Sequence, residues 1–221
     1  MTREFAAEPP FDCPRCSRLV EFRAACRLRD PAGHNAPVHS FGPPDARLLV
    51  VGLAPGRDGA NRTGRPFTGD WAGDLLYETL GRYGFASGRY DERPDDGLVL
   101  IDCMITNAVR CVPPANKPLP AEVATCRDFL VERIASLDRL AVVLALGRIA
   151  HESIVRCFGQ RLAAVPFGHG RQHIVSLSAR PLRLFDSYHC SRYNTNTGVL
   201  TAEMFGAVFG EIRRYLDGPT R

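Results

Sequence analysis

Eight cysteines and two polar side chains are the residues of this chain whose types and spacing could do chemistry. Cys13 and Cys16 form a C-x2-C pair, and fourteen residues separate Cys111 from Cys126. Two close thiolates and two distant ones can complete a four-cysteine metal site. Buried, unpaired cysteines are the alternative. Spacing alone does not separate zinc from an iron–sulfur cluster.

The remaining cysteines lie outside this set: Cys26, Cys103, Cys157 and Cys190. Cys103 and Cys157 stand in strand-like and helix-like apolar contexts, so we expect both to pack in the core.

A glycine-rich segment, GLAPGRDGANRTGRPFTGD over residues 52–70, follows an apolar run and leads into a helical pattern. Glycines at such a place let backbone N–H groups approach a ligand closely. A phosphate-binding loop is one interpretation, but the G-x4-G-K-S/T pattern is absent. Two further polar side chains, Asn107 and His189, follow other apolar runs.

The elements that must position these residues alternate along the chain. We expect strands at 46–53, 98–106, 140–146, 174–177 and 182–185. We expect helices at 71–83, 120–137, 147–157 and 201–216. This order predicts an α/β fold, a three-layer α/β/α arrangement with a central, mostly parallel sheet. Residues 1–45 read as an irregular N-terminal arm of one domain spanning 1–221.

Ligands bind beyond the carboxyl ends of the strands in such sheets. The segments that follow three of the predicted strands are 54–70, 106–114 and 187–197. They hold the most unusual sequence of the chain, so we expect the functional site there.

Composition bounds the remaining possibilities. Hydrophobic residues make up 45% of the chain and charged residues 24%, as in ordinary globular proteins. No apolar run nears the roughly 20 residues that span a bilayer, and the N-terminus lacks the apolar core of a secretion signal. We therefore expect a cytoplasmic protein, in which structural disulfides are rare and metal ligation is the usual role of spaced cysteines.

The net charge of +4 is compatible with a nucleic-acid partner. The positive charge comes from arginine, since Lys117 is the only lysine. Arginine binds phosphate in a planar fork. A GC-rich genome also favours arginine over lysine, and we favour this compositional explanation of the excess of arginine.

Four stretches in order resemble one known family. GLAPG with NRTGRPFTGD resembles the first motif of the iron–sulfur uracil-DNA glycosylases, family 5. Family 4 has an acidic residue where this chain has Leu53. ITNAVRCVPP at 105–114, LALG at 144–147, and YHCS with NTNTGVLT at 188–201 resemble the later motifs. The match runs from Cys13 to about Phe209, with Cys190 where the family usually has proline.

The resemblance implies a structural [4Fe–4S] cluster bound by four residues that match the family's ligands: Cys13, Cys16, Cys111 and Cys126. On this resemblance, the cluster would pin the N-terminal arm beside the loop after the second strand.

The resemblance also implies a pocket for a flipped base, formed by Leu53, Ala54, Pro55, Phe67, Asn107 and His189. Flipping a base out of the duplex costs a few kcal/mol, and stacking on Phe67 recovers about 1–3 kcal/mol. The amide of Asn107 has a donor and an acceptor that suit O4 and N3–H of uracil. His189 would donate to O2 as negative charge develops there.

Catalysis on this interpretation uses three residues: Asp70, His189 and Asn107. Asp70 would stabilise the sugar cation and orient water, since Leu53 supplies no carboxylate. Asp58 and Asp74 are rival acids. We expect DNA contacts from Arg62, Ser191, Arg192 and Asn194.

The implied function is hydrolysis of the N-glycosidic bond of uracil in DNA, leaving an abasic site. Hypoxanthine and other deaminated bases stay open as further substrates, and we expect a monomer. One alternative is a non-catalytic nucleic-acid-binding protein with a zinc or cluster site. Another is a small-molecule enzyme that binds a nucleotide phosphate in the glycine-rich loop.

Overall fold

The computed structural model describes residues 7–177 and 180–218. Its main sheet has five strands in the spatial order β4 (Cys103–Asn107), β1 (Leu48–Gly52), β5 (Val142–Leu146), β7 (Arg180–Ser187) and β6 (Gln172–Leu177). β4, β1, β5 and β7 run parallel, and β6 pairs antiparallel with β7. A separate two-stranded sheet joins β2 (Ala86–Ser87) to β3 (Val99–Leu100).

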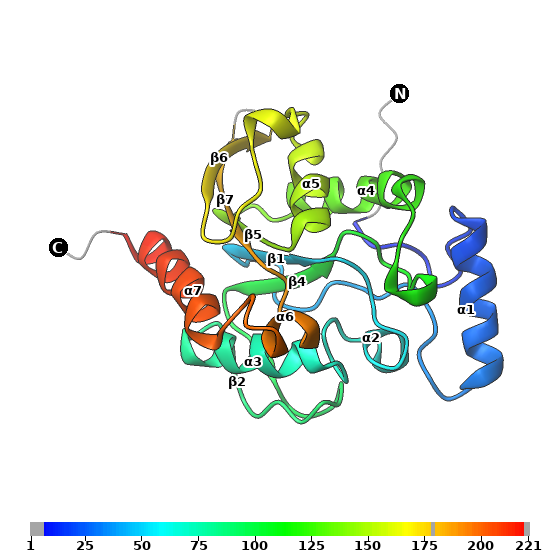
Figure 1. Cartoon of the computed structure of the whole chain (residues 1–221). Helices are drawn as coiled ribbons and strands as arrows, with labels where there is room; N and C mark the ends of the chain where they lie inside the picture. The colour runs from blue at the N-terminus through cyan, green and yellow to red at the C-terminus, as the bar shows by residue number, and fades with distance from the viewer. Residues whose placement is uncertain (1–6, 178–179, 219–221) are drawn as a thin grey trace.

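Helices cover both faces of the main sheet (Figure 1). One face carries α4 (Pro120–Ala135) and α5 (Arg148–Cys157), and the other carries α3 (Trp71–Arg82) and α7 (Ala202–Asp217). The shorter elements are α2 (Ala60–Thr63), α6 (Arg192–Asn196) and two 3-10 turns, η1 (Pro114–Asn116) and η2 (Leu162–Ala164). The predicted three-layer, mostly parallel fold class is confirmed.

The central strands are apolar without interruption because both of their faces are covered. In β1, Leu48 and Val50 pack toward α3 and α7, while Leu49 and Val51 pack toward α4 and α5. Strand geometry alternates the faces in this way. Every residue of β1 is buried, so this strand fixes the place from which the glycine-rich loop departs.

The N-terminal segment differs from the expected irregular arm, because Ser17–Arg29 forms a 13-residue helix, α1. Its buried residues are Leu19, Arg23 and Cys26, which have helical spacing. Because Arg23 is one of these buried residues, the apolar residues of this segment alone do not show helical spacing.

The expected strand at 98–106 is two strands. Asp102, between them, has a left-handed φ of 55°, and its carboxylate accepts hydrogen bonds from the backbone N–H and the Nε of Arg47. Across 7–177 and 180–218, no helix is long and apolar enough to cross a membrane.

Candidate active site

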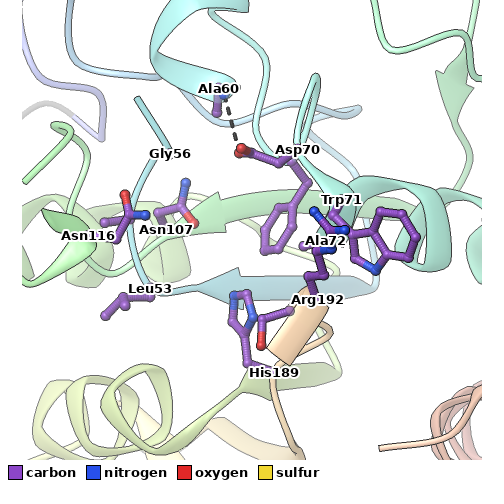
Figure 2. Close-up of a pocket in the computed structure, with 13 residues that line it drawn as sticks. Leu53, Gly56, Ala60, Asp70, Trp71, Ala72, Asn107, Asn116, His189 and Arg192 are labelled. Carbon is purple, nitrogen blue, oxygen red and sulfur yellow. Dashed lines mark hydrogen bonds between the residues drawn. The ribbon is translucent and has the colours of Figure 1, made fainter. Parts of the chain in front are cut away.

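A cavity of about 470 Å³ lies beyond the carboxyl ends of β1 and β4. Its lining residues come from the carboxyl end of β4 and from the segments that follow β1, β4 and β7: Leu53, Ala54, Gly56, Ala60, Phe67, Asp70, Trp71, Ala72, Asn107, Asn116, His189, Ser191 and Arg192 (Figure 2). The strand-end location expected from the sequence is therefore where the cavity lies. Segments more than 130 residues apart in the chain meet there, since Leu53 and His189 both line it.

Phe67 forms one wall of the cavity, in a left-handed backbone conformation with φ of 55°. Its carbonyl accepts a hydrogen bond from the Tyr90 hydroxyl at 3.2 Å, which holds this conformation from outside the loop. The Phe67 and His189 rings are nearly parallel, with an interplanar angle of 26° and centroids 5.9 Å apart. Both rings line the cavity.

Asp70 occupies the N-cap position just before α3, but among the described residues its side chain makes no capping hydrogen bond to that helix. Its carboxylate instead accepts a long hydrogen bond of 3.4 Å from the backbone N–H of Ala60 (Figure 2). A β-carbon on Gly56 or Gly59 would lie within 2.6 Å of this carboxylate, so both glycines are needed to admit it. Burial raises the pKa of Asp70.

The rival acids lie elsewhere. Asp58 is 69% exposed and pairs with Arg57 at 2.8 Å. Asp74 is exposed on α3. Neither lines the cavity that Asp70 lines, so the geometry favours Asp70 among the three.

His189 and Asn107 present polar groups to the cavity. Burial lowers the pKa of His189 to about 4, so its imidazole is neutral at pH 7 and one ring nitrogen carries a proton to donate. The carbonyl of His189 accepts a hydrogen bond from Nδ2 of Asn194 at 2.8 Å. Asn107 ends β4 and is almost fully buried. A buried amide beside a neutral imidazole is suited to recognising a polar, uncharged ring.

The sequence matches a family model described as the uracil DNA glycosylase superfamily over residues 39–213. The chain belongs to this superfamily. A type-5 uracil-DNA glycosylase of Thermus thermophilus is 42% identical over 97% of this chain and 98% of its own length. A type-5 enzyme of Pyrobaculum aerophilum is 38% identical over 89% and 86%. A type-4 enzyme of Archaeoglobus fulgidus is 33% identical over 69% of each chain.

Most of the residues expected from the superfamily motifs line the cavity, but three do not. Pro55 is buried and is not among the lining residues. Arg62 lies outside, on a neighbouring depression, where it pairs with Asp30 at 3.4 Å. Asn194 supports the backbone of His189 instead of lining the cavity. The expected DNA contacts of Arg62 and Asn194 stay predictions.

Asn116 and Trp71 line the cavity and were not singled out from the sequence. Asn116 belongs to η1, where Ala115 and Asn116 both have positive φ, near 52° and 55°. Asn tolerates this conformation better than other non-glycine residues. An asparagine shortly after the Pro-Pro pair was therefore the sequence feature that could have indicated this turn. Trp71 directly follows Asp70, and only the fold shows that its ring lies at the cavity.

Cys190, the departure from the family motif noted in the sequence, lies in the loop after β7. It is fully buried, and its thiol donates a hydrogen bond to the carbonyl of Ala72 at 3.4 Å. The cysteine thereby joins the loop after β7 to the start of α3, the two segments on either side of the cavity mouth.

The four cysteines expected to hold a cluster line a second, small cavity on the α1 side of the sheet. Two N–H groups donate to their sulfurs: Nη1 of Arg23 to Cys111 at 3.0 Å, and the backbone of Arg110 to Cys126 at 3.3 Å. Nε of Arg23 is buried there and has no hydrogen-bond acceptor among the described residues. In the part of the chain that the structure describes, no three His, Cys, Asp or Glu side chains form a group suited to hold a metal ion.

Proposed function

We propose that this chain is a monofunctional uracil-DNA glycosylase of type 5, which hydrolyses the N-glycosidic bond of uracil in DNA and leaves an abasic site. The observation that carries the proposal is the single cavity lined by Phe67, Asn107, His189 and Asp70. The names of the relatives support the same reaction. Recognition needs a base-sized cavity with a flat wall and a few polar groups, and this one has them.

The reacting base enters the cavity by leaving the stack, at a cost of a few kcal/mol. It lies against the ring of Phe67. Asn107 donates from Nδ2 to O4 of uracil and accepts from N3–H through Oδ1. Cytosine has an amino donor at position 4 and an unprotonated N3, so it mismatches both groups.

The glycosidic bond breaks with its electron pair moving to the base. The neutral imidazole of His189 donates a hydrogen bond to O2, where negative charge grows, as an oxyanion-hole donor does. Water adds to C1′ of the sugar, and the Asp70 carboxylate orients it and accepts its proton. The base leaves as an anion that takes up a proton from solvent, so the net reaction consumes one water.

We further propose that Cys13, Cys16, Cys111 and Cys126 hold a [4Fe–4S] cluster, which supplies a structural cross-link. Zinc needs four ligand atoms about 2.3 Å from one point, whereas each thiolate of a cluster binds its own iron. All four cysteines line one small cavity, as ligands of one such cluster would. The N–H donors to two sulfurs and the guanidinium of Arg23 suit a negatively charged group.

The test of the function is release of free uracil from a uracil-containing oligonucleotide at enzyme excess, compared with Asp70→Asn. Free base together with an intact, alkali-labile backbone supports a monofunctional glycosylase. Tight DNA binding without base release would instead favour the non-catalytic binding protein. Hypoxanthine-containing DNA in the same assay decides whether other deaminated bases are substrates.

A further inference from the structure

Trp71 is a large apolar side chain placed at the mouth of the cavity with 52% of it exposed. It is the first residue of α3 and directly follows Asp70. Scattered exposed apolar residues are normal on a protein surface. Trp71 differs from these because it lines a ligand-sized cavity, where a bound ligand can reach it.

Two contacts from α6 hold the indole in place. Its Nε1–H donates to Oγ1 of Thr195 at 3.2 Å. The guanidinium carbon of Arg192 lies 5.3 Å from the ring centroid, a cation–π distance. Figure 2 shows Trp71 and Arg192 together on one side of the cavity. A ring held by both contacts is preorganised, so it loses little conformational entropy when a ligand stacks on it.

The chemistry of this pair fits a nucleotide. A base stacked on an aromatic face contributes about 1–3 kcal/mol whatever its identity, and a guanidinium binds phosphate in a planar fork. Arg192 occupies the ring from one side, and the exposed part of the indole offers a flat apolar surface.

We propose that Trp71 and Arg192 form a platform for the base next to the flipped nucleotide, so that the protein prefers single-stranded or locally opened DNA. The inference rests on the proposed function, because the flipped nucleotide enters through this mouth and carries its neighbour past Trp71. A neighbour paired to a second strand keeps its faces inside the duplex stack. An unpaired neighbour is free to stack on the indole.

The chain has a single tryptophan, so its fluorescence reports on Trp71 alone. The probe is a short single-stranded oligonucleotide with one uracil, added to the Asp70→Asn variant to slow turnover. We expect saturable quenching of the emission. An oligonucleotide with abasic sites on both sides of the uracil should quench little and bind about 5–150-fold more weakly, the factor that corresponds to one stacked base.

Substitutions separate stacking from general damage. Trp71→Ala should weaken binding of the single strand by the same factor and binding of the duplex much less, while Trp71→Phe should keep most of the affinity. Ile174→Ala, at an exposed apolar residue of the distant edge strand β6, is the matched control and should bind both DNAs as the parent does.

Two results would overturn the platform: unquenched emission at DNA concentrations where the anisotropy of a labelled oligonucleotide shows full binding, or equal losses for single strand and duplex in Trp71→Ala. The proposed function fails separately, through absence of base release from uracil-DNA by the unsubstituted protein. Quenching without base release would leave the platform standing, and base release without quenching would remove the platform alone.

Discussion

Gly52 and Phe67 approach each other so closely that a β-carbon on Gly52 would lie 2.5 Å from Cζ of the Phe67 ring. The same β-carbon would lie 2.4 Å from Oδ1 of Asn107. The last residue of β1 must therefore be glycine for the aromatic wall and the amide to share one cavity. Its φ is not in the left-handed region, so the requirement is steric and not conformational.

Gly52→Ala should consequently fold but lose its pocket geometry. Overpacking of this kind costs about 1–3 kcal/mol, and we expect single-turnover uracil excision to fall about 10²-fold or more, from displacement of one recognition group. Gly81→Ala is the matched control, because its β-carbon meets nothing within 4 Å and alanine favours a helix interior. Normal excision by Gly52→Ala would contradict the steric argument.

Asp70→Asn should slow the chemical step about 10²–10⁴-fold, as expected for a positioned acid–base group, with DNA binding within a few-fold of the parent. Asp58→Asn and Asp74→Asn are the controls, and both should excise uracil at nearly the parental rate. Single-turnover excision at saturating enzyme makes the comparison. An essential Asp58 or Asp74 with a dispensable Asp70 would reverse the assignment.

The raised pKa of Asp70 adds a stability test of the same substitution. The folded pKa exceeds the unfolded value of about 3.9, so the folded state binds more protons between the two values. Stability therefore falls as pH rises through that window. Asp70→Asn removes the buried charge and should melt at a higher temperature than the parent at pH 7. A lower melting temperature would mean that the carboxylate is there for structure.

Asn107→Asp replaces an amide donor with a carboxylate that repels O4 and the departing anionic base. We expect uracil excision to fall about 10²-fold or more, the usual effect of losing one such donor. Asn116→Asp, measured in parallel, shows how much the second amide of the cavity contributes to uracil excision compared with Asn107. Unchanged single-turnover rates for Asn107→Asp would place that side chain outside recognition.

The double substitution Cys13→Ser, Cys111→Ser should remove the iron and the visible absorption of the purified protein. Hydrogen exchange over α1 should accelerate, because the free energy of metal binding is also folding free energy. Cys157→Ser is the control, since this half-buried cysteine is outside the set of four. Full iron content in the double variant would exclude the cluster assignment.

His151 and Asp186 form a buried pair at the end of β7, with Nδ1 and Oδ1 2.7 Å apart. Burial alone lowers the pKa of His151, but its hydrogen bond and charge interaction with Asp186 outweigh that and raise it. His151→Ala removes the shortest hydrogen bond of the buried Asp186 carboxylate, which still accepts one from the backbone N–H of Gly168 at 3.3 Å. The loss should cost about 3–5 kcal/mol. Urea unfolding measures this loss.

The raised pKa of His151 determines how the stability loss in His151→Ala depends on pH. The stabilisation by His151 is fully present below its unfolded pKa of about 6.5 and is lost as pH rises through the folded value. The deficit of His151→Ala should therefore be larger at mildly acidic than at alkaline pH. Glu78→Ala, which breaks an exposed ion pair with Arg82, should change stability by about 0.5 kcal/mol or less. A pH-independent deficit would argue against a charged His151.

The sequence by itself determined the layers of this fold and the end of the sheet where the cavity lies. Uninterrupted apolar strands such as Leu48–Gly52 are stable only when covered on both faces, and the alternating order of helices supplies that cover. The local motif was also sufficient to bring Phe67 and Asp70 into one loop. The residue roles, the monomeric state and the cytoplasmic location stay predictions.

Only the tertiary structure decided which side chains reach the cavity. Trp71 and Asn116 lie there because α3 begins, and η1 turns, at its rim, while Arg62 points to another depression and Asn194 supports His189. It also decided that residues 17–29 are helical. Arg23 is buried in this helix because its guanidinium donates a hydrogen bond to the distant Cys111 thiol, which the local sequence does not show. Local periodicity records burial of apolar groups, but a polar group is buried only where a partner distant in sequence satisfies it.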